Sequence, residues 1–185
     1  QEVDGSRHQD ANVQSDRPLF LLDLFCGTAG VAAAFKACGG EALGIDHIID
    51  KRRVKGPVSK IDLTKQESQD TVLGWLKSGK VDAVMLAPPC GTASRAREMR
   101  KGMQPAPLRS DKFPMGLPTL RGVAKLKVKA ANRLYKFASK VIKICVVKDI
   151  PEICENPRRS IMWLTDFFTD LPEECRFQHV HSCMY

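Results

Sequence analysis

The sequence lacks any apolar run long enough to cross a membrane, and residues 1–18 contain no apolar segment of the kind that a secretory signal requires. Its seven cysteines are an odd number, and none forms a Cys-x-x-Cys pair. The pattern therefore predicts neither a disulfide framework nor a zinc site. We expect a soluble protein with no membrane partner in an intracellular, reducing compartment, which would be the nucleus in a eukaryote.

Two regions are expected along the chain. The first residues are polar and show no periodicity, so residues 1–18 are expected to form a disordered leader. The rest, residues 19–185, suits one domain with a hydrophobic core, because apolar residues make up 43% of the 185-residue chain.

Residues 19–30, Leu-Phe-Leu-Leu-Asp-Leu-Phe-Cys-Gly-Thr-Ala-Gly, are typical of a buried strand that runs into a tight loop and then a helix. The glycines allow a ligand to approach the backbone, and the helix expected over 31–38 directs free N–H groups at the same place. A second strand, 43–46, ends in Asp46, where an acid can bind both ribose hydroxyls. The pattern favours a nucleotide site, although glycines that only form a tight connection would give the same loop.

Further strands are expected at 58–62, 81–86 and 151–155, with helices over 66–78 and 122–149. A last helix is expected to open at residues 158–160. This alternation predicts an α/β fold, a doubly wound and mostly parallel sheet with helices on both faces.

The strand over 81–86 runs into Pro88, Pro89 and Cys90. Two prolines fix the backbone and present the thiol at the carboxyl edge of the sheet, where α/β folds bind ligands. Arg95 and Arg97 follow closely, and positive neighbours favour a thiolate; they would serve equally as clamps for phosphates or for a base. The alternative for Cys90 is a small buried residue at a strand end.

Three motifs in this order resemble those of S-adenosylmethionine-dependent methyltransferases, and most closely the DNA cytosine-5 branch. They are the Asp-Leu-Phe-Cys-Gly-Thr-Ala-Gly of residues 23–30, the Pro-Pro-Cys of 88–90 and the Glu-Asn of 155–156. The residues of these motifs are also similar to those of diverged methyltransferase domains carried by phages and mobile elements. The resemblance covers about residues 19–163 and implies a Rossmann-like methyltransferase domain with S-adenosyl-L-methionine as cofactor.

The resemblance also implies a cofactor site. Its residues would be Asp23, Phe25, Cys26, Gly27, Thr28, Gly30, Asp46, Asp62 and Pro88. Asp62 follows the third strand, where the family has an acid that contacts the adenine amino group. Asp62 or Thr64 would serve equally as an N-cap of the next helix.

The catalytic residues implied by the resemblance are Cys90, Glu155, Arg95 and Arg97. The family's thiolate adds to cytosine C6 so that C5 can attack the sulfonium methyl, while the glutamate grips the ring N3 and the exocyclic amine. Amino-methyltransferases have an aromatic residue after their Pro-Pro, and Cys90 stands there instead. The sequence departs from the family in having Pro157 in place of Val, a longer spacing between Cys90 and Glu155, and no Gln-x-Arg-x-Arg motif.

Positive charge is concentrated in residues 95–159, which contain seventeen Lys or Arg and five Asp or Glu, whereas the whole chain carries +8. In the helix over 122–149, cations recur on one face: Lys125, Lys129, Arg133, Lys136, Lys140 and Lys143. Apolar residues recur on the other: Leu126, Ala131, Leu134, Ala138, Val141, Ile142 and Cys145. A face of this kind fits nucleic acid, with DNA favoured by the resemblance, and fits a solvated surface equally well. In the family, the loop corresponding to 101–118 closes over flipped-out DNA.

Near the C-terminus, His179 and His181 lie close to Cys175 and Cys183. The cluster could ligate a metal, but we favour a half-buried face of a sixth strand and expect no metal site. No segment is large enough for a separate target-recognition domain. The chain is therefore either a fragment, incomplete at its C-terminus, or a minimal member that contacts DNA through the basic helix and loop.

The sequence thus predicts methylation of cytosine C5 in DNA by a cysteine nucleophile. Amino-methylation or RNA cytosine methylation is the alternative within the same class. From a different class, the chain would be a catalytically inactive module that binds nucleic acid. Nothing in the sequence indicates the target site or the oligomeric state.

Overall fold

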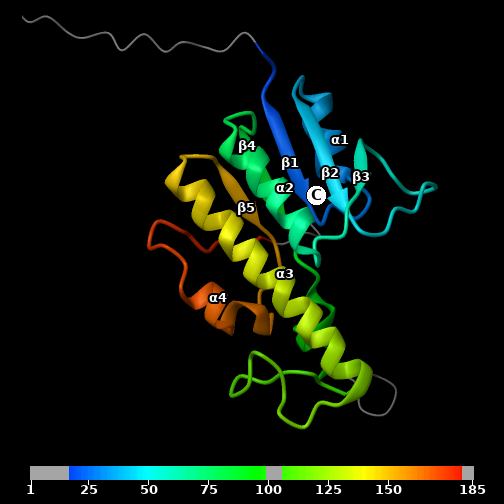
Figure 1. Cartoon of the computed structure of the whole chain (residues 1–185), viewed down its shortest axis with the longest axis vertical. Coiled ribbons are helices and arrows are strands. Elements are labelled where there is room, and N and C mark those ends of the chain that lie inside the picture. Colours follow the sequence, from blue (N-terminus) through cyan, green and yellow to red (C-terminus); the bar gives the residue numbers. More distant parts are fainter. Residues whose placement is uncertain (1–16, 99–105, 181–185) are drawn as a thin grey trace, which may run out of the picture.

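The structure is a computed structural model that describes residues 17–98 and 106–180. Its centre is a five-stranded sheet in the order β3-β2-β1-β4-β5, in which every neighbouring pair is parallel (Figure 1). The strands are β1 (Phe20–Leu24), β2 (Glu41–Asp46), β3 (Val58–Lys60), β4 (Ala83–Leu86) and β5 (Glu152–Cys154). The order reverses between β1 and β4, which is the switch point where such sheets bind ligands.

Helices cover both faces of this sheet (Figure 1). They are α1 (Gly30–Ala37), α2 (Gln66–Lys77), α3 (Gly122–Val147) and α4 (Asp166–Thr169). Because side chains alternate along a strand, Leu21 packs against Ala32 of α1, whereas Leu22 and Leu24 join the larger core beneath α2 and α3. The predicted doubly wound α/β fold is confirmed.

The C-terminal part differs from the prediction. Instead of one helix opening at residues 158–160, a short 3₁₀ turn, Ile161–Leu164, precedes α4. Residues 170–180 form no strand within the described range, so the expected sixth strand is wrong as far as Val180. His179 is exposed on this segment rather than on a half-buried strand face, while His181 and Cys183 lie outside the described residues.

Helix α3 has one unexpected exposure. Leu126, predicted on the apolar face, is 65% exposed, and Val128 is buried in its place. The buried surface of the helix is wider farther along, where Phe137, Ala138 and Ser139 are consecutive and all buried, because α3 packs between the sheet and α4. A helical period alone does not reveal such a two-sided contact.

The start of the described chain is attached to the sheet. Arg17 forms an ion pair with Asp82, which also accepts a hydrogen bond from the backbone of Phe20 at 2.7 Å. Residues 1–16 of the expected leader lie outside the described residues. None of the described helices combines the length and the hydrophobicity that a bilayer-spanning segment needs.

Substitution of Gly56 tests how closely the loop between β2 and β3 packs on α1. A Cβ at Gly56 would lie 2.8 Å from the Ala29 carbonyl oxygen and 2.9 Å from the Ala33 nitrogen, which are backbone atoms. We expect Gly56→Ala to lower the free energy of unfolding by about 1–3 kcal/mol. Gly74→Ala is the control, since nothing lies within 4 Å of its Cβ position in α2, and it should stabilise by up to about 1 kcal/mol. Urea unfolding measures both, and equal effects would contradict the packing.

Candidate active site

The three predicted motifs begin at the carboxyl edge of the sheet because β1, β4 and β5 end level with one another. Leu24 of β1 is paired with Leu86 of β4, and Leu86 with Cys154 of β5. The next residues, Phe25, Ala87 and Glu155, are therefore neighbours along the edge, about 5 Å apart from strand to strand. The backbone hydrogen bonds between the strands continue to these residues. The Ala87 nitrogen donates to the Leu24 oxygen at 3.1 Å, and the Glu155 nitrogen donates to the Leu86 oxygen at 2.7 Å.

The glycine loop between β1 and α1 has a constrained backbone. Phe25, Gly27 and Ala29 have φ values of 61°, 54° and 55°, in the left-handed region that only glycine adopts freely. Nothing lies within 4 Å of a Cβ built on Gly27, so the loop faces open space there. Strained residues of this kind persist where surrounding contacts hold them, and they cluster at ligand sites.

Asp46, at the end of β2, holds the loop in place. Its Oδ2 accepts a hydrogen bond from the Gly27 nitrogen at 3.0 Å. Its Oδ1 accepts from the His47 and Ile48 nitrogens at 2.7 and 3.2 Å. Because Oδ2 accepts one such bond, a lone pair remains for a ligand hydroxyl.

A second carboxyl group lies behind the loop. Asp23 is 2% exposed, and its Oδ2 accepts a hydrogen bond from the Ala32 nitrogen at 3.3 Å. Burial raises the pKa of Asp23 to about 6, the bond from Ala32 opposes this, and the charge of Asp46 adds to it. No Lys or Arg within the described residues forms an ion pair with either carboxyl group. Two carboxyl groups without a Lys or Arg partner therefore lie at the described loop.

Three further predicted cofactor residues lie around the loop. Cys26 packs against β2, since a Cβ on Gly44 would lie 2.7 Å from its Sγ, and burial raises the pKa of the thiol to about 12. Thr28 is exposed, and Gly30 begins α1. The roles of these side chains toward a cofactor stay predictions.

Asp62 follows β3 on the same edge. It accepts hydrogen bonds from the nitrogen and hydroxyl of Thr64 at 2.9 and 2.7 Å, and these bonds lower its pKa. Neither residue is the N-cap of α2, because that position is Lys65 and it has no side-chain cap. The N-cap alternative for Asp62 or Thr64 is wrong, and adenine contact by Asp62 stays a prediction.

The Cys90 turn is held from both sides. Asn156, after β5, donates from Nδ2 to the Pro88 oxygen at 2.7 Å, and the Tyr135 hydroxyl of α3 donates to the Pro89 oxygen at 2.9 Å. Cys90 is half-buried and begins a 3₁₀ turn, Cys90–Thr92, while Glu155 is exposed. Cys90 and Glu155 thus follow neighbouring strands, and the hydrogen bond from Asn156 to Pro88 joins the two segments.

The two predicted arginines bind elsewhere in the loop. Arg95 pairs with Glu98 and Asp111, and the bond to Asp111 is the main reason that its pKa is raised. Arg97 donates to the Gly91 and Ala106 oxygens at 2.7 and 3.4 Å. Among the described residues, neither guanidinium forms a hydrogen bond with the Cys90 thiol. Both shape the loop, and their catalytic role stays a prediction.

A third arginine, missed by the sequence analysis, lies beneath the Cys90 turn. Arg109 is 1% exposed, donates twice to the Thr92 hydroxyl at 3.2 and 3.0 Å, and donates to the Pro114 oxygen at 2.6 Å. Its guanidinium lies 5.1 Å from the Tyr135 ring centre, and burial lowers its pKa. Burial also raises the pKa of the Tyr135 hydroxyl, and the charge of the nearby Cys90 thiolate raises it further. Arg109 therefore ties the loop that follows the Cys90 turn to the turn itself.

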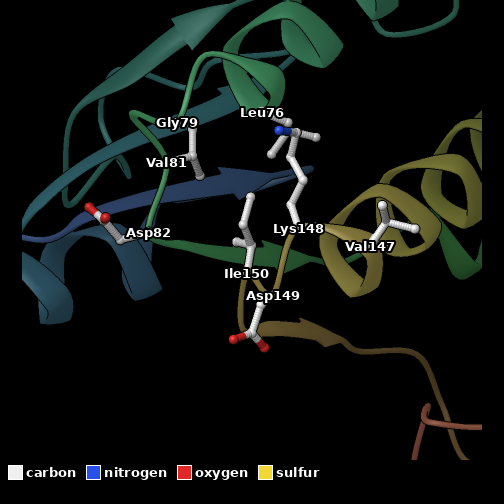
Figure 2. Close-up of a pocket in the computed structure, with 8 residues that line it drawn as sticks. All are labelled: Leu76, Gly79, Val81, Asp82, Val147, Lys148, Asp149 and Ile150. Atoms are coloured by element: carbon white, nitrogen blue, oxygen red, sulfur yellow. The ribbon is translucent and has the colours of Figure 1, made fainter. Parts of the chain in front are cut away.

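A hollow of about 530 Å³ lies at the opposite edge of the sheet. Figure 2 shows that it is formed by the turns before β4 and β5, where Gly79, Asp82 and Asp149 lie. It contains none of the predicted site residues. The carboxyl edge remains the better candidate, because strained backbone and a buried carboxyl group converge there.

No protein-family model and no curated protein matches the chain. Among solved structures, the chain is similar to a trans-2-enoyl-CoA reductase of Clostridium acetobutulicum in complex with NADH, with 12% sequence identity and a TM-score of 0.35. The match covers 80% of this chain and 51% of that chain, so this chain spans about half the length of the reductase. A TM-score this low supports no conclusion about the present site.

Because the pKa of Asp23 is raised, we expect the free energy of unfolding to fall as the pH rises. An acid with a raised folded-state pKa stabilises the fold fully below its ordinary pKa of 3.8, and this stability is lost as the pH rises through about 6. Asp23→Asn should match the wild type at acidic pH and exceed it by up to about 3 kcal/mol near neutrality. Urea unfolding across this pH range measures the difference, and a gap that stays constant with pH would contradict it.

Proposed function

We propose that this chain methylates C5 of cytosine in DNA with S-adenosylmethionine as the methyl donor. The observation that carries the proposal is the common edge of the sheet, because the segments with the acid-lined glycine loop, Cys90 and Glu155 follow three adjacent strands there. A nucleophile, an acid and a nucleotide-type loop on adjacent strand ends suit a methyl transfer to an activated ring.

The residues present fit this cofactor. S-adenosylmethionine carries a sulfonium and an ammonium group, which suit the negative potential of Asp46 and of Asp23, buried behind the loop. The free lone pair on Asp46 Oδ2 suits a ribose hydroxyl. The open space at Gly27 allows the ligand to approach the backbone.

The bound cofactor would supply an electrophilic methyl group. The Cys90 thiolate would add to cytosine C6, so that the S–C6 bond forms and the ring electron pair becomes available at C5. The bond between C5 and the methyl group would then form as the bond from that methyl to the sulfonium sulfur breaks, which leaves a neutral thioether. Glu155 shares a proton with ring N3 during this addition. Loss of the C5 proton to a base then returns the electron pair, and the S–C6 bond breaks.

DNA that contains 5-fluorocytosine tests the nucleophile, because fluorine blocks loss of the C5 substituent and traps the adduct. We expect a covalent complex with the wild type in the presence of S-adenosylmethionine, none with Cys90→Ser, and unchanged yield with Cys38→Ser, an exposed cysteine after α1. Glu155→Gln should slow trapping by about 10²-fold or more. Denaturing electrophoresis measures the adduct.

An adduct that persists in Cys90→Ser would end this mechanism. Mass spectrometry of nucleosides from unmodified DNA and RNA substrates identifies the product. Methylation on an exocyclic amine, or on RNA alone, would replace the proposed reaction by its alternative in the same class.

Calorimetry tests the cofactor site. Asp46→Asn should weaken S-adenosylmethionine binding about tenfold or more, because it removes a charge and disturbs the bond to the Gly27 nitrogen. Asp70→Asn, an exposed acid on α2, should leave binding unchanged. Wild-type protein that binds DNA but no S-adenosylmethionine would instead be a non-catalytic nucleic-acid-binding module.

A further inference from the structure

Helix α3 carries a row of unpaired positive charge. None of its 26 residues is acidic. We define the basic stripe as five exposed residues that recur every three or four positions: Lys125, Lys129, Arg133, Lys136 and Lys140. Among the described residues, none of the five has a carboxylate partner. The sixth cation of the sequence pattern, Lys143, pairs with Asp170 at 2.6 Å, so the stripe ends at Lys140.

The first half of α3 extends past the edge of the sheet that carries Cys90 (Figure 1). The Tyr135 hydroxyl bonds to the Pro89 oxygen, which marks the level of that edge. Before Tyr135, the helix packs on the loop that follows the Cys90 turn: Asn132 donates to the Met115 oxygen at 2.9 Å, and Val128 lies against Gly116. The first three residues of the basic stripe, Lys125, Lys129 and Arg133, therefore lie on the part of α3 that packs on the loop after the Cys90 turn.

We propose that the basic stripe binds the phosphate backbone of duplex DNA, an inference that rests on the proposed function for its choice of polyanion. From Lys125 to Lys140 the helix rises about 22 Å, with roughly one cation per turn. That length matches about six base pairs of duplex.

The side chains on α3 favour a duplex over a single strand. Proteins that bind single strands stack bases on exposed aromatic rings. The aromatic residues of α3, Tyr135 and Phe137, are both buried, so the stripe offers charge without a stacking surface. It therefore suits contacts with the backbone that do not depend on base sequence.

The stripe is also unfavourable for the helix alone. Like charges three or four residues apart repel one another. Lys125 lies in the first turn of α3, near the positive end of the helix dipole, where acids are preferred. An external anion relieves both effects, whereas water relieves them only in part.

Fluorescence anisotropy with a labelled duplex of about 20 base pairs, at several salt concentrations and without cofactor, tests the proposal. The stripe variant combines Lys129→Glu, Arg133→Glu and Lys136→Glu. Its control carries the same charge change at the opposite edge of the sheet, with Lys77→Glu, Lys80→Glu and Lys148→Glu, which are all exposed. We expect the stripe variant to lose affinity for the duplex at least tenfold, and the control less than threefold. The slope of log affinity against log salt concentration should become shallower by about 2.7 in the stripe variant. Circular dichroism and the Gln versions of the same variants separate lost binding from lost folding.

Equal losses in both variants, tighter binding of the single strand, or retention only on vesicles of anionic lipid would overturn the proposal. The anisotropy measurements use the Cys90→Ser background, so catalysis does not affect binding, whereas adduct formation is measured in stripe and control variants that retain Cys90. Stripe-dependent binding without any 5-fluorocytosine adduct would reject the proposed function alone. An adduct whose formation is unaffected by the stripe variant would reject the stripe alone.

Discussion

Parallel pairing of β1, β4 and β5 in register is the constraint on which the candidate site depends. It brings Phe25, Ala87 and Glu155, which are far apart in the chain, to one edge with little contribution from loops. Two side-chain bonds then complete the arrangement: Asp46 holds the glycine loop, and Asn156 holds the Cys90 turn. A shift of one residue between β4 and β5 would move Glu155 relative to the Cys90 turn, and one between β1 and β4 would move the glycine loop; either shift would reverse which side chains of the shifted strand face each helix layer.

Much of the architecture was predictable because its signals are local. Apolar runs that end in Gly27, Asp46 or Pro88 marked β1, β2 and β4, and Gly79 marked the end of α2. The order of these elements sufficed for the fold class. The site residues were predicted from short motifs at strand ends, and parallel strands bring such ends together without further information. What those residues do chemically stays a prediction.

What the sequence did not reveal depends on contacts between distant segments. Arg109 lies in a proline-rich loop, and nothing local indicates that it becomes buried on Thr92 and Tyr135. Leu126 fits a helical apolar period, yet it lies where α3 has left the sheet and has no core to enter. His179 fits a strand pattern, but β5 gains no neighbour from that segment in the described chain.

The bond from the Tyr135 hydroxyl to the Pro89 oxygen has a mechanical consequence. It fastens the turn that carries Cys90 to the middle of a long helix, so the position of the thiol is tied to that of α3. A polymer lying on the outer surface of α3 would be held at a set height above the sulfur. The geometry of the helix, rather than the motion of a lid, would then determine which unit of the polymer reaches the cysteine.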